Sequence, residues 1–382
     1  MVDGYGSVIT DRRTYLKAVL TMMAGSAGWE RRPVEPMATP RSLWRVPDQG
    51  RGTPALDSQS AFFLSRRDEI VAVDRHSGHV RWRAGIPDTS GVGTGVHVVA
   101  TRGVVIAGGQ GLVGCDAATG ARSWRFMPGE GQSVGCYLGA RASSDGTVFA
   151  GSTVGLVYAI NPRSGTIRWR TQVGGTSTVV YWPEVSGDAV MVAFTDFDDP
   201  SHSGVATLAS TSGRVRWISP LPSSEGTGAP RVAGGPVAGE SLVAVSGHDG
   251  SLHVLDLLSG RGVWSLPPPR IEPDFRALAC AGGVLVAGSL SGDVVAYELA
   301  TGQERWRSRP VLASVAFALS AGECEVLVPY VSGVLVALAV TDGVERWRMG
   351  GSGAGFRWPP RVDGRHLFLA GSTTGFHAWV ES

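Results

Sequence analysis

A tryptophan returns at a nearly constant interval along this chain of 382 residues. The successive intervals are 38, 42, 45, 48, 47, 42 and 41 residues. A repeat of this length, made of several short strands, is typical of the blades of a β-propeller. The repeating tryptophans are Trp44, Trp82, Trp124, Trp169, Trp217, Trp264, Trp306 and Trp347.

A tight turn precedes most of these tryptophans. In the unit that ends at Trp82, Asp74 begins the turn and Ser77 and Gly78 close it. The Asp side chain accepts hydrogen bonds from nearby main-chain N–H groups in such a turn, and the glycine takes a positive φ. Apolar residues alternate on either side, which predicts a β-hairpin. The turn glycines are Gly78, Gly120, Gly165, Gly213, Gly260, Gly302 and Gly343.

Two further apolar runs precede each turn, so each unit predicts four antiparallel strands. Seven such units run from about Thr53 to Arg348. The tryptophan of the outermost strand is too large to be covered by one sheet, because an indole side chain buries ~150–250 Å². We therefore expect each repeating tryptophan to dock between neighbouring sheets.

The two ends of the chain complement each other. Residues 358–380 predict three strands without an outer tryptophan strand, whereas Leu43–Val46 is a tryptophan strand without inner partners. We expect the ends to complete an eighth blade and close the ring, which removes exposed sheet edges. The predicted fold is an all-β, eight-bladed propeller over residues 41–382. A seven-bladed ring with spare ends is the competing arrangement.

The Asp-x-x-Ser/Thr-Gly-x-x-x-Trp unit resembles the PQQ-like β-propeller repeat of quinoprotein alcohol dehydrogenases. The same repeat builds the barrel-assembly-machinery propeller lipoprotein and the sensor propellers of some bacterial serine/threonine kinases. The resemblance covers about Leu43 to Val380. It implies the fold but leaves the function open, because one propeller architecture serves both enzymes and scaffolds.

The resemblance also implies what a quinone enzyme of this family carries. Its dehydrogenases have two adjacent cysteines over the cofactor, a calcium or lanthanide ion held by Glu and Asn, and an Asp base. Here Cys115, Cys136, Cys280 and Cys324 are far apart. We therefore expect no cofactor and a protein that is not an enzyme. A ligand-binding or PQQ-dependent oxidoreductase that uses the channel mouth, with PQQ or calcium, is the alternative.

Several aromatic residues fall in or beside the predicted innermost strands. Alternate residues of such strands face the central channel, and a concave apolar site with a few polar groups is the usual ligand pocket. Packing between sheets as ordinary core aromatics is the interpretation that we favour for most of these rings. The candidate ligand site at the channel mouth comprises His97, Tyr137, Trp182, Arg276, Phe317 and Trp358.

An acidic loop is predicted at residues 195–203, between the second and third strands of its blade. Its closely spaced carboxylates, Asp196, Asp198 and Asp199, are the oxygen ligands that a hard cation such as calcium prefers. The loop would then be a metal site that stabilises the fold. A solvated acidic insertion is the interpretation that we favour.

Arginine directly follows the repeating tryptophan in most units. On an outer strand these arginines alternate with the tryptophan and predict a solvated, positively charged rim that discourages edge pairing. A binding surface for an acidic partner is the alternative. The whole chain has 34 Lys and Arg against 33 Asp and Glu. A net charge of +1 argues against nucleic acid as a partner. The arginines are Arg45, Arg83, Arg125, Arg170, Arg307 and Arg348.

Residues 1–40 predict a signal segment and linker. Arg12 and Arg13, followed by Tyr15, Leu16 and a short apolar run, resemble a twin-arginine export signal. No apolar run reaches the ~18 residues that span a bilayer. We expect an exported, extracytoplasmic protein; a cytoplasmic protein with an N-terminal helix is the alternative.

The predicted function follows from these features together. We expect a monomeric, non-catalytic propeller that acts as a scaffold and presents its rim or mouth loops to protein or peptide partners.

Overall fold

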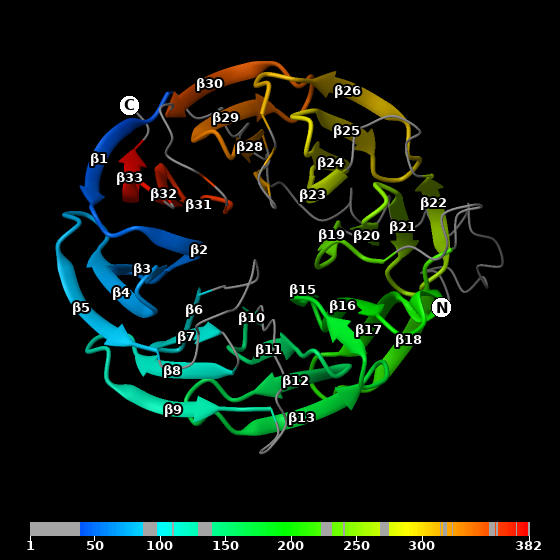
Figure 1. The fold of residues 1–382 in the computed structure, drawn as a ribbon, viewed down its shortest axis with the longest axis horizontal. Coiled ribbons are helices and arrows are strands. Elements are labelled where there is room, and N and C mark those ends of the chain that lie inside the picture. Colours follow the sequence, from blue (N-terminus) through cyan, green and yellow to red (C-terminus); the bar gives the residue numbers. More distant parts are fainter. Residues whose placement is uncertain are drawn as a thin grey trace, which may run out of the picture. The chain divides into compact units, whose positions relative to one another are not determined.

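Eight antiparallel sheets follow one another around a ring and form the blades of a propeller (Figure 1). They lie in the compact unit Pro36–Ser382. The computed structural model describes residues 39–86, 98–108, 111–128, 140–222, 231–239, 241–267, 275–313, 315, 319–322, 324–350, 356, 358–371 and 373–380. The predicted eight-bladed all-β fold is confirmed, and the seven-bladed arrangement is wrong.

The first three blades each have four strands, ordered from the channel outward. Blade 1 contains β2 (Gly50–Leu56), β3 (Ser60–Ser65), β4 (Glu69–Asp74) and β5 (Val80–Gly85). Blade 2 contains β6 (Val98–Thr101), β7 (Val104–Gly108), β8 (Leu112–Asp116) and β9 (Arg122–Phe126). Blade 3 contains β10 (Ala140–Ala142), β11 (Val148–Gly151), β12 (Leu156–Ile160) and β13 (Ile167–Gln172).

Blade 4 departs from the four-stranded pattern. Its innermost position is divided between β14 (Thr178–Val180) and β15 (Glu184–Ser186), which both pair with β16 (Ala189–Asp196). The blade continues with a short 3-10 helix, η1 (Pro200–His202), and with β17 (Gly204–Ala209) and β18 (Val215–Pro220).

No helix in the described part of the chain is long and apolar enough to cross a membrane.

The last four blades return to four strands. Blade 5 contains β19 (Val237–Ala238), β20 (Leu242–Ser246), β21 (Leu252–Asp256) and β22 (Gly262–Leu266). Blade 6 contains β23 (Phe275–Ala281), β24 (Val284–Ser289), β25 (Val294–Glu298) and β26 (Glu304–Ser308). Blade 7 contains β27 (Ser320–Ala321), β28 (Glu325–Pro329), β29 (Val334–Ala339) and β30 (Glu345–Gly350). Blade 8 contains β31 (Arg361–Asp363), β32 (His366–Gly371), β33 (Gly375–Val380) and β1 (Arg41–Val46).

Blade 8 is built from both ends of the propeller. Strand β1 pairs antiparallel with β33, so that Arg41 lies opposite Val380 and Val46 lies opposite Phe376. In Figure 1 the blue strand β1 lies beside the red strand β33. The predicted closure of the ring is therefore confirmed.

The core lies between blades, because the middle strands of each blade are buried on both faces. In β3, Phe62 packs with Val105 of blade 2, while its neighbour Phe63 packs against Phe376 of blade 8, with 4.4 Å between the ring centroids. Both phenylalanines are fully buried. This double burial explains why the middle strands have continuous apolar runs rather than strict alternation.

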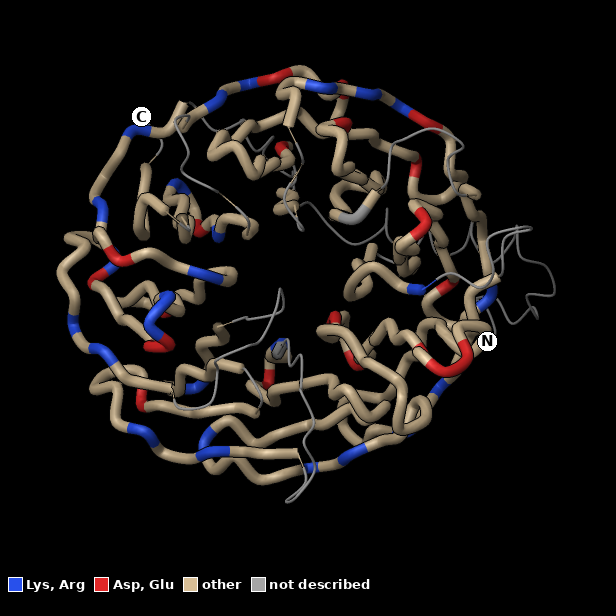
Figure 2. The backbone as a smooth tube through the Cα atoms, viewed as in Figure 1, with Lys and Arg blue, Asp and Glu red and all other residues tan. Residues whose placement is uncertain are grey.

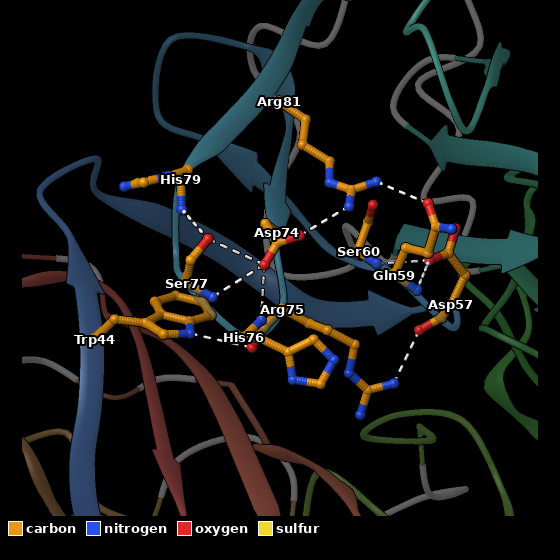
Figure 3. Close-up of polar contacts among 10 residues, drawn as sticks. All are labelled: Trp44, Asp57, Gln59, Ser60, Asp74, Arg75, His76, Ser77, His79 and Arg81. Carbon is orange, nitrogen blue, oxygen red and sulfur yellow. Dashed lines mark hydrogen bonds and ion pairs between the residues drawn. The ribbon is translucent and has the colours of Figure 1, made fainter.

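Seven of the repeating tryptophans join one blade to the next. Each indole Nε1 donates to a main-chain carbonyl in the turn between the third and fourth strands of the following blade, over 2.8–3.1 Å. Figure 3 shows the first case, in which Trp44 donates to the carbonyl of Arg75. Each indole also packs on the turn glycine, where an added Cβ would lie within 3.0 Å of the ring.

The turn itself is held by its first residue. The Asp74 carboxylate accepts hydrogen bonds from the N–H groups of His76 and Ser77 and from the Ser77 hydroxyl, at 3.0–3.1 Å (Figure 3). Arg81 donates to the same carboxylate over 2.8 Å. The bonds from Ser77 and Arg81 hold the pKa of Asp74 well below its usual value. The turn therefore presents a fixed carbonyl and a fixed glycine to the indole of the preceding blade.

The eighth tryptophan lacks this partner. Trp347 lies between blades 7 and 8, and in blade 8 no turn joins β33 to β1 because these strands come from opposite ends of the chain. Trp347 is only 4% exposed, yet its Nε1 has no hydrogen-bond partner among the residues described. Closing the ring with β33 and β1 thus leaves the Trp347 donor without a partner among the described residues.

Replacing Gly120 by alanine tests the packing of the indole on the turn. Gly120 has φ +75°, and an added Cβ would lie 2.5 Å from Cε3 of Trp82. Gly103 has nearly the same φ, +76°, but an added Cβ would meet nothing within 4 Å. We expect Gly103→Ala to cost about 1 kcal/mol of unfolding free energy and Gly120→Ala about 3–4 kcal/mol, measured by urea unfolding. Equal losses would show that the indole contact contributes nothing.

His377 makes the closing strand sensitive to acid. It lies in β33 opposite Arg45, and its ring stacks on Trp379 with 5.1 Å between the centroids. Burial, reinforced by the charge of Arg45, lowers the pKa of His377 to about 4. Protons then bind the unfolded chain more tightly than the folded one, so this group's stabilisation falls as the pH drops from about 6.5 to about 4.

Substituting His377 by glutamine should therefore flatten the pH dependence of unfolding across that window. Unfolding in urea at a series of pH values measures the effect. The exposed His79 lies in a turn of blade 1, and His79→Gln is the control. A wild-type slope retained by His377→Gln would contradict the prediction.

Candidate functional site

The loop between β16 and β17, residues 197–203, is the most elaborate strand connection described in blade 4. We call it the blade 4 loop. Asp196 anchors it: Oδ1 accepts from the N–H groups of Asp198 and Asp199, both at 3.0 Å, and Oδ2 accepts from the Thr178 hydroxyl at 2.9 Å. The hydrogen bond from the Asp199 N–H contributes most to lowering the pKa of Asp196, and the bonds from Thr178 and Asp198 add to it. They outweigh the burial of the residue, which acts in the opposite direction. The loop is therefore fixed to the strands beneath it.

The other two carboxylates of the predicted metal site have their own partners. Asp198 accepts from the Ser177 hydroxyl. Asp199 caps η1 by accepting from the N–H and the hydroxyl of Ser201, at 3.0 and 2.6 Å. In the described part of the chain, no group of three or more His, Cys, Asp and Glu side chains is arranged to hold a metal ion. Hydrogen bonds within the loop explain its acidic residues, and calcium binding stays a prediction.

Phe197 is an exposed aromatic residue held rigidly at the start of the blade 4 loop. Its side chain is 48% exposed. Its N–H donates to the carbonyl of Ser177 over 3.2 Å, and the guanidinium carbon of Arg231 lies 5.2 Å from the ring centroid. Arg231 is itself fixed by a 2.7 Å bond from the His248 N–H to its carbonyl. The main chain of Phe197 is thus anchored, and its ring lies against the Arg231 guanidinium with about half of its surface in solvent.

Rigid exposed aromatics and arginines are the side chains that contribute most to protein interfaces. Phe197 and Arg231 come from consecutive blades, and the Val232 N–H donates to Thr195 Oγ1 over 2.9 Å beside them. The sequence alone does not predict this pair. The only signal for it was an aromatic residue set among three aspartates, and nothing in the sequence placed Arg231 beside it.

The structure describes only part of the candidate site at the channel mouth. His97, Tyr137 and Phe317 lie outside the described residues. The main chain of Arg276 belongs to β23, and its side chain is not described. Of the six predicted members, the structure therefore describes the side chains of Trp182 and Trp358.

The two described members of that site are not brought together. Trp182 lies between β14 and β15, and its ring meets Tyr181 edge-on with 6.1 Å between the centroids. A Cβ added to Gly235 of the next blade would collide with Trp182. This close packing between blades 4 and 5 agrees with the core interpretation for Trp182. Trp358 is half-buried just before β31 of blade 8, across the ring from blade 4 (Figure 1).

A buried Asp–Ser–His chain in blade 5 has the residue types of a hydrolase. Ser251 Oγ donates to Asp249 over 2.6 Å and lies 3.0 Å from His253 Nε2. Ser251 has no exposed surface, and burial lowers the pKa of His253. A substrate cannot reach this serine, so the chain of hydrogen bonds stabilises the turn between β20 and β21 rather than catalysing a reaction.

Comparison with known proteins places the chain among propellers of one family. The family model described as "Outer membrane protein assembly factor BamB" matches residues 25–138, 137–323 and 267–355. The protein of that name from Yersinia pestis is 24% identical over 276 residues, which are 67% of this chain and 64% of the relative. The one from Xanthomonas campestris pv. campestris is 33% identical over 82 residues, 19% of this chain and 20% of the relative. The chain thus spans less than two thirds of both relatives.

Solved structures agree on the fold. The crystal structure of BamB from Moraxella catarrhalis has a TM-score of 0.68 at 17% identity and covers 90% of this chain and 98% of that one. A quinohemoprotein alcohol dehydrogenase from Pseudomonas putida HK5 has a TM-score of 0.66 at 13% identity, over 90% and 75% of the two chains. Because a BamB and an alcohol dehydrogenase are about equally similar to this chain in shape, these structures establish the architecture alone. Since the family model matches from residue 25 to residue 355, the chain belongs to the PQQ-like β-propeller family described as outer membrane protein assembly factor BamB.

Proposed function

We propose that this chain is a non-catalytic propeller that binds protein partners through the blade 4 loop and the adjoining start of blade 5. The observation that carries the proposal is Phe197, half-exposed and held between Ser177 and Arg231. A large apolar ring kept in one position loses little conformational entropy when a partner covers it, so it favours binding. The acidic side chains of Asp198 and Asp199 beside it favour a partner with a basic rim around an apolar pocket.

The relatives support a protein partner. The proteins from Yersinia pestis and Xanthomonas campestris are named outer membrane protein assembly factors, a name that refers to work on other proteins. We propose that the partners of this chain are likewise proteins of the cell envelope. The twin-arginine-like segment around Arg12 and Arg13 supports export, and the chain would act there as a monomer.

Phe197→Ala tests the docking surface. We expect it to weaken capture of the partner by about 30-fold, or about 2 kcal/mol, because alanine cannot fill the partner's pocket. The melting temperature should stay unchanged, since half of the ring is already in solvent. Quantitative mass spectrometry of proteins crosslinked to the purified chain in a native envelope extract measures the effect.

Leu258→Ala is the matched control. Leu258 is an equally apolar and more exposed residue, in the turn after β21 at the opposite end of the strands. It should leave capture of the same protein unchanged. Equal capture by Phe197→Ala and the wild type would exclude the blade 4 loop as the docking surface.

The proposed function requires neither PQQ nor calcium. Protein purified from its native source should therefore show no quinone absorbance, and excess EDTA should leave its melting temperature unchanged, since Asp196, Asp198 and Asp199 are held by the loop's own hydrogen bonds. Absorbance spectra and thermal unfolding with and without chelator measure both. Stoichiometric quinone with alcohol oxidation would favour the oxidoreductase alternative, and a lower melting temperature in EDTA would favour a structural cation.

A further inference from the structure

The outermost strands of the blades have a strong excess of arginine. They contain no Lys or Asp, and their only Glu residues are Glu304 and Glu345. In a chain with a net charge of +1, this wall of the propeller is therefore much more basic than the rest (Figure 2). The arginines on these strands are Arg41, Arg45, Arg81, Arg83, Arg122, Arg125, Arg168, Arg170, Arg216, Arg305, Arg307, Arg346 and Arg348.

Blades 6 and 7 neutralise most of their own arginines. Glu304 stands two residues before Trp306 and pairs with Arg307 over 2.8 Å. Glu345 stands at the same place in blade 7 and pairs with Arg348. The bond from Arg348 lowers the pKa of Glu345. The bond to Glu304 raises the pKa of Arg307. A surface made of such pairs has little attraction for an anion.

Blades 2 and 3 lack these glutamates. The position two residues before the tryptophan is Arg122 in blade 2 and Ile167 in blade 3. Arg122, Arg163 and Arg170 are exposed and form no ion pair with any acidic side chain in the described part of the chain. We define the arginine arc as Arg122, Arg163 and Arg170, on the outer wall of blades 2 and 3.

The nearby acids are already engaged. Asp116 accepts from the hydroxyl and N–H of Thr119, bonds that lower its pKa, and Asp145 pairs with Arg168 over 3.4 Å. Among the described residues, no carboxylate therefore forms an ion pair with Arg122, Arg163 or Arg170.

The members of the arc form one surface. Trp124 of β9 donates to the carbonyl of Pro162 over 2.8 Å and packs on Gly165, so the turn that contains Arg163 lies against β9. Arg170 follows on β13, the outer strand of the next blade. Exposed aliphatic side chains lie on or next to the same outer strands: Ile167 of β13 is 44% exposed, and Met127, directly after β9, is 40% exposed.

We propose that the arginine arc binds an anionic phospholipid surface. Guanidinium groups match phosphate oxygens with two parallel hydrogen bonds, and the exposed Ile167 and Met127 suit the boundary between headgroups and acyl chains. Lipid headgroups move laterally, so they adapt to arginines spread over a curved wall, whereas a folded acidic protein needs matched positions. Binding along the wall puts the ring side-on to the membrane and leaves both loop-bearing ends of the strands accessible.

Co-flotation of the purified full chain with vesicles tests the proposal. We expect binding to phosphatidylcholine vesicles with about 30 mol% phosphatidylglycerol at about 0.05 M NaCl, and none to pure phosphatidylcholine or at about 0.5 M NaCl. Each arginine near an anionic surface contributes about fivefold in affinity, so the double variant R122Q/R170Q should bind about 20-fold more weakly. Arg163 lies in the turn between β12 and β13, and Arg163→Gln should lower the affinity for the vesicles about fivefold.

The control R307Q/R348Q removes the same number of charges from blades 6 and 7. It should bind within about twofold of the wild type, because these arginines are already paired. All substituted side chains are exposed, so thermal unfolding should be unchanged in every variant. Equal losses in the two double variants would overturn the proposal in favour of a net-charge effect. Absence of vesicle binding, or binding of soluble polyglutamate in its place, would also overturn it.

Discussion

The contact between an indole and the turn of the next blade is the interaction on which this propeller depends. The tryptophan belongs to one sheet, while the carbonyl and the glycine that receive it belong to the following sheet, as with Trp82 on Ala117 and Gly120. Each link thus contributes to the interface energy between two neighbouring blades. Blades stabilise one another around the ring, as the units of other repeat proteins do. Each contact also joins the outermost strand of one sheet to the turn of the next sheet. The wall of the ring is therefore held at one point in each of these blades.

The joint between blades 7 and 8 shows what closure costs. The other seven joints use a turn, but here the propeller begins and ends, and the buried Nε1 of Trp347 has no hydrogen-bond partner in the part of the chain that the structure describes. An unpaired buried donor costs about 1–3 kcal/mol. Pairing of β1 with β33 supplies main-chain hydrogen bonds in compensation, and Trp44 extends the series of tryptophan links into blade 1. The same seam includes His377, so closure of the ring and protonation are coupled there.

The sequence alone predicted the blades because the features that build them are local. It predicted the closure because the outer tryptophan strand that is missing at the end of the repeat array is present at its start. Trp82 and Gly78 lie in one short hairpin, and their spacing specifies its turn. The sequence did not predict that this glycine receives the indole of the preceding blade, nor that Phe197 is held by Arg231, because both contacts join residues distant in the chain. The innermost strands are also hard to interpret: β19 and β27 have two residues each, too few for alternation to assign a face.

A rigid wall leaves particular positions free to change. The tryptophan and the turn glycine fix the outer strand. The side chain two places before the tryptophan is not part of this contact. It is Arg122 in blade 2, Ile167 in blade 3 and Glu304 in blade 6. In blade 6 that residue neutralises Arg307. In blade 1 it is Val80, and Arg83 pairs instead with Asp48. In blade 3 it is Ile167, and Arg170 has no ion pair among the described residues. One repeat can therefore give each side of the ring a different charge without altering the core, so the propeller architecture by itself does not specify a function.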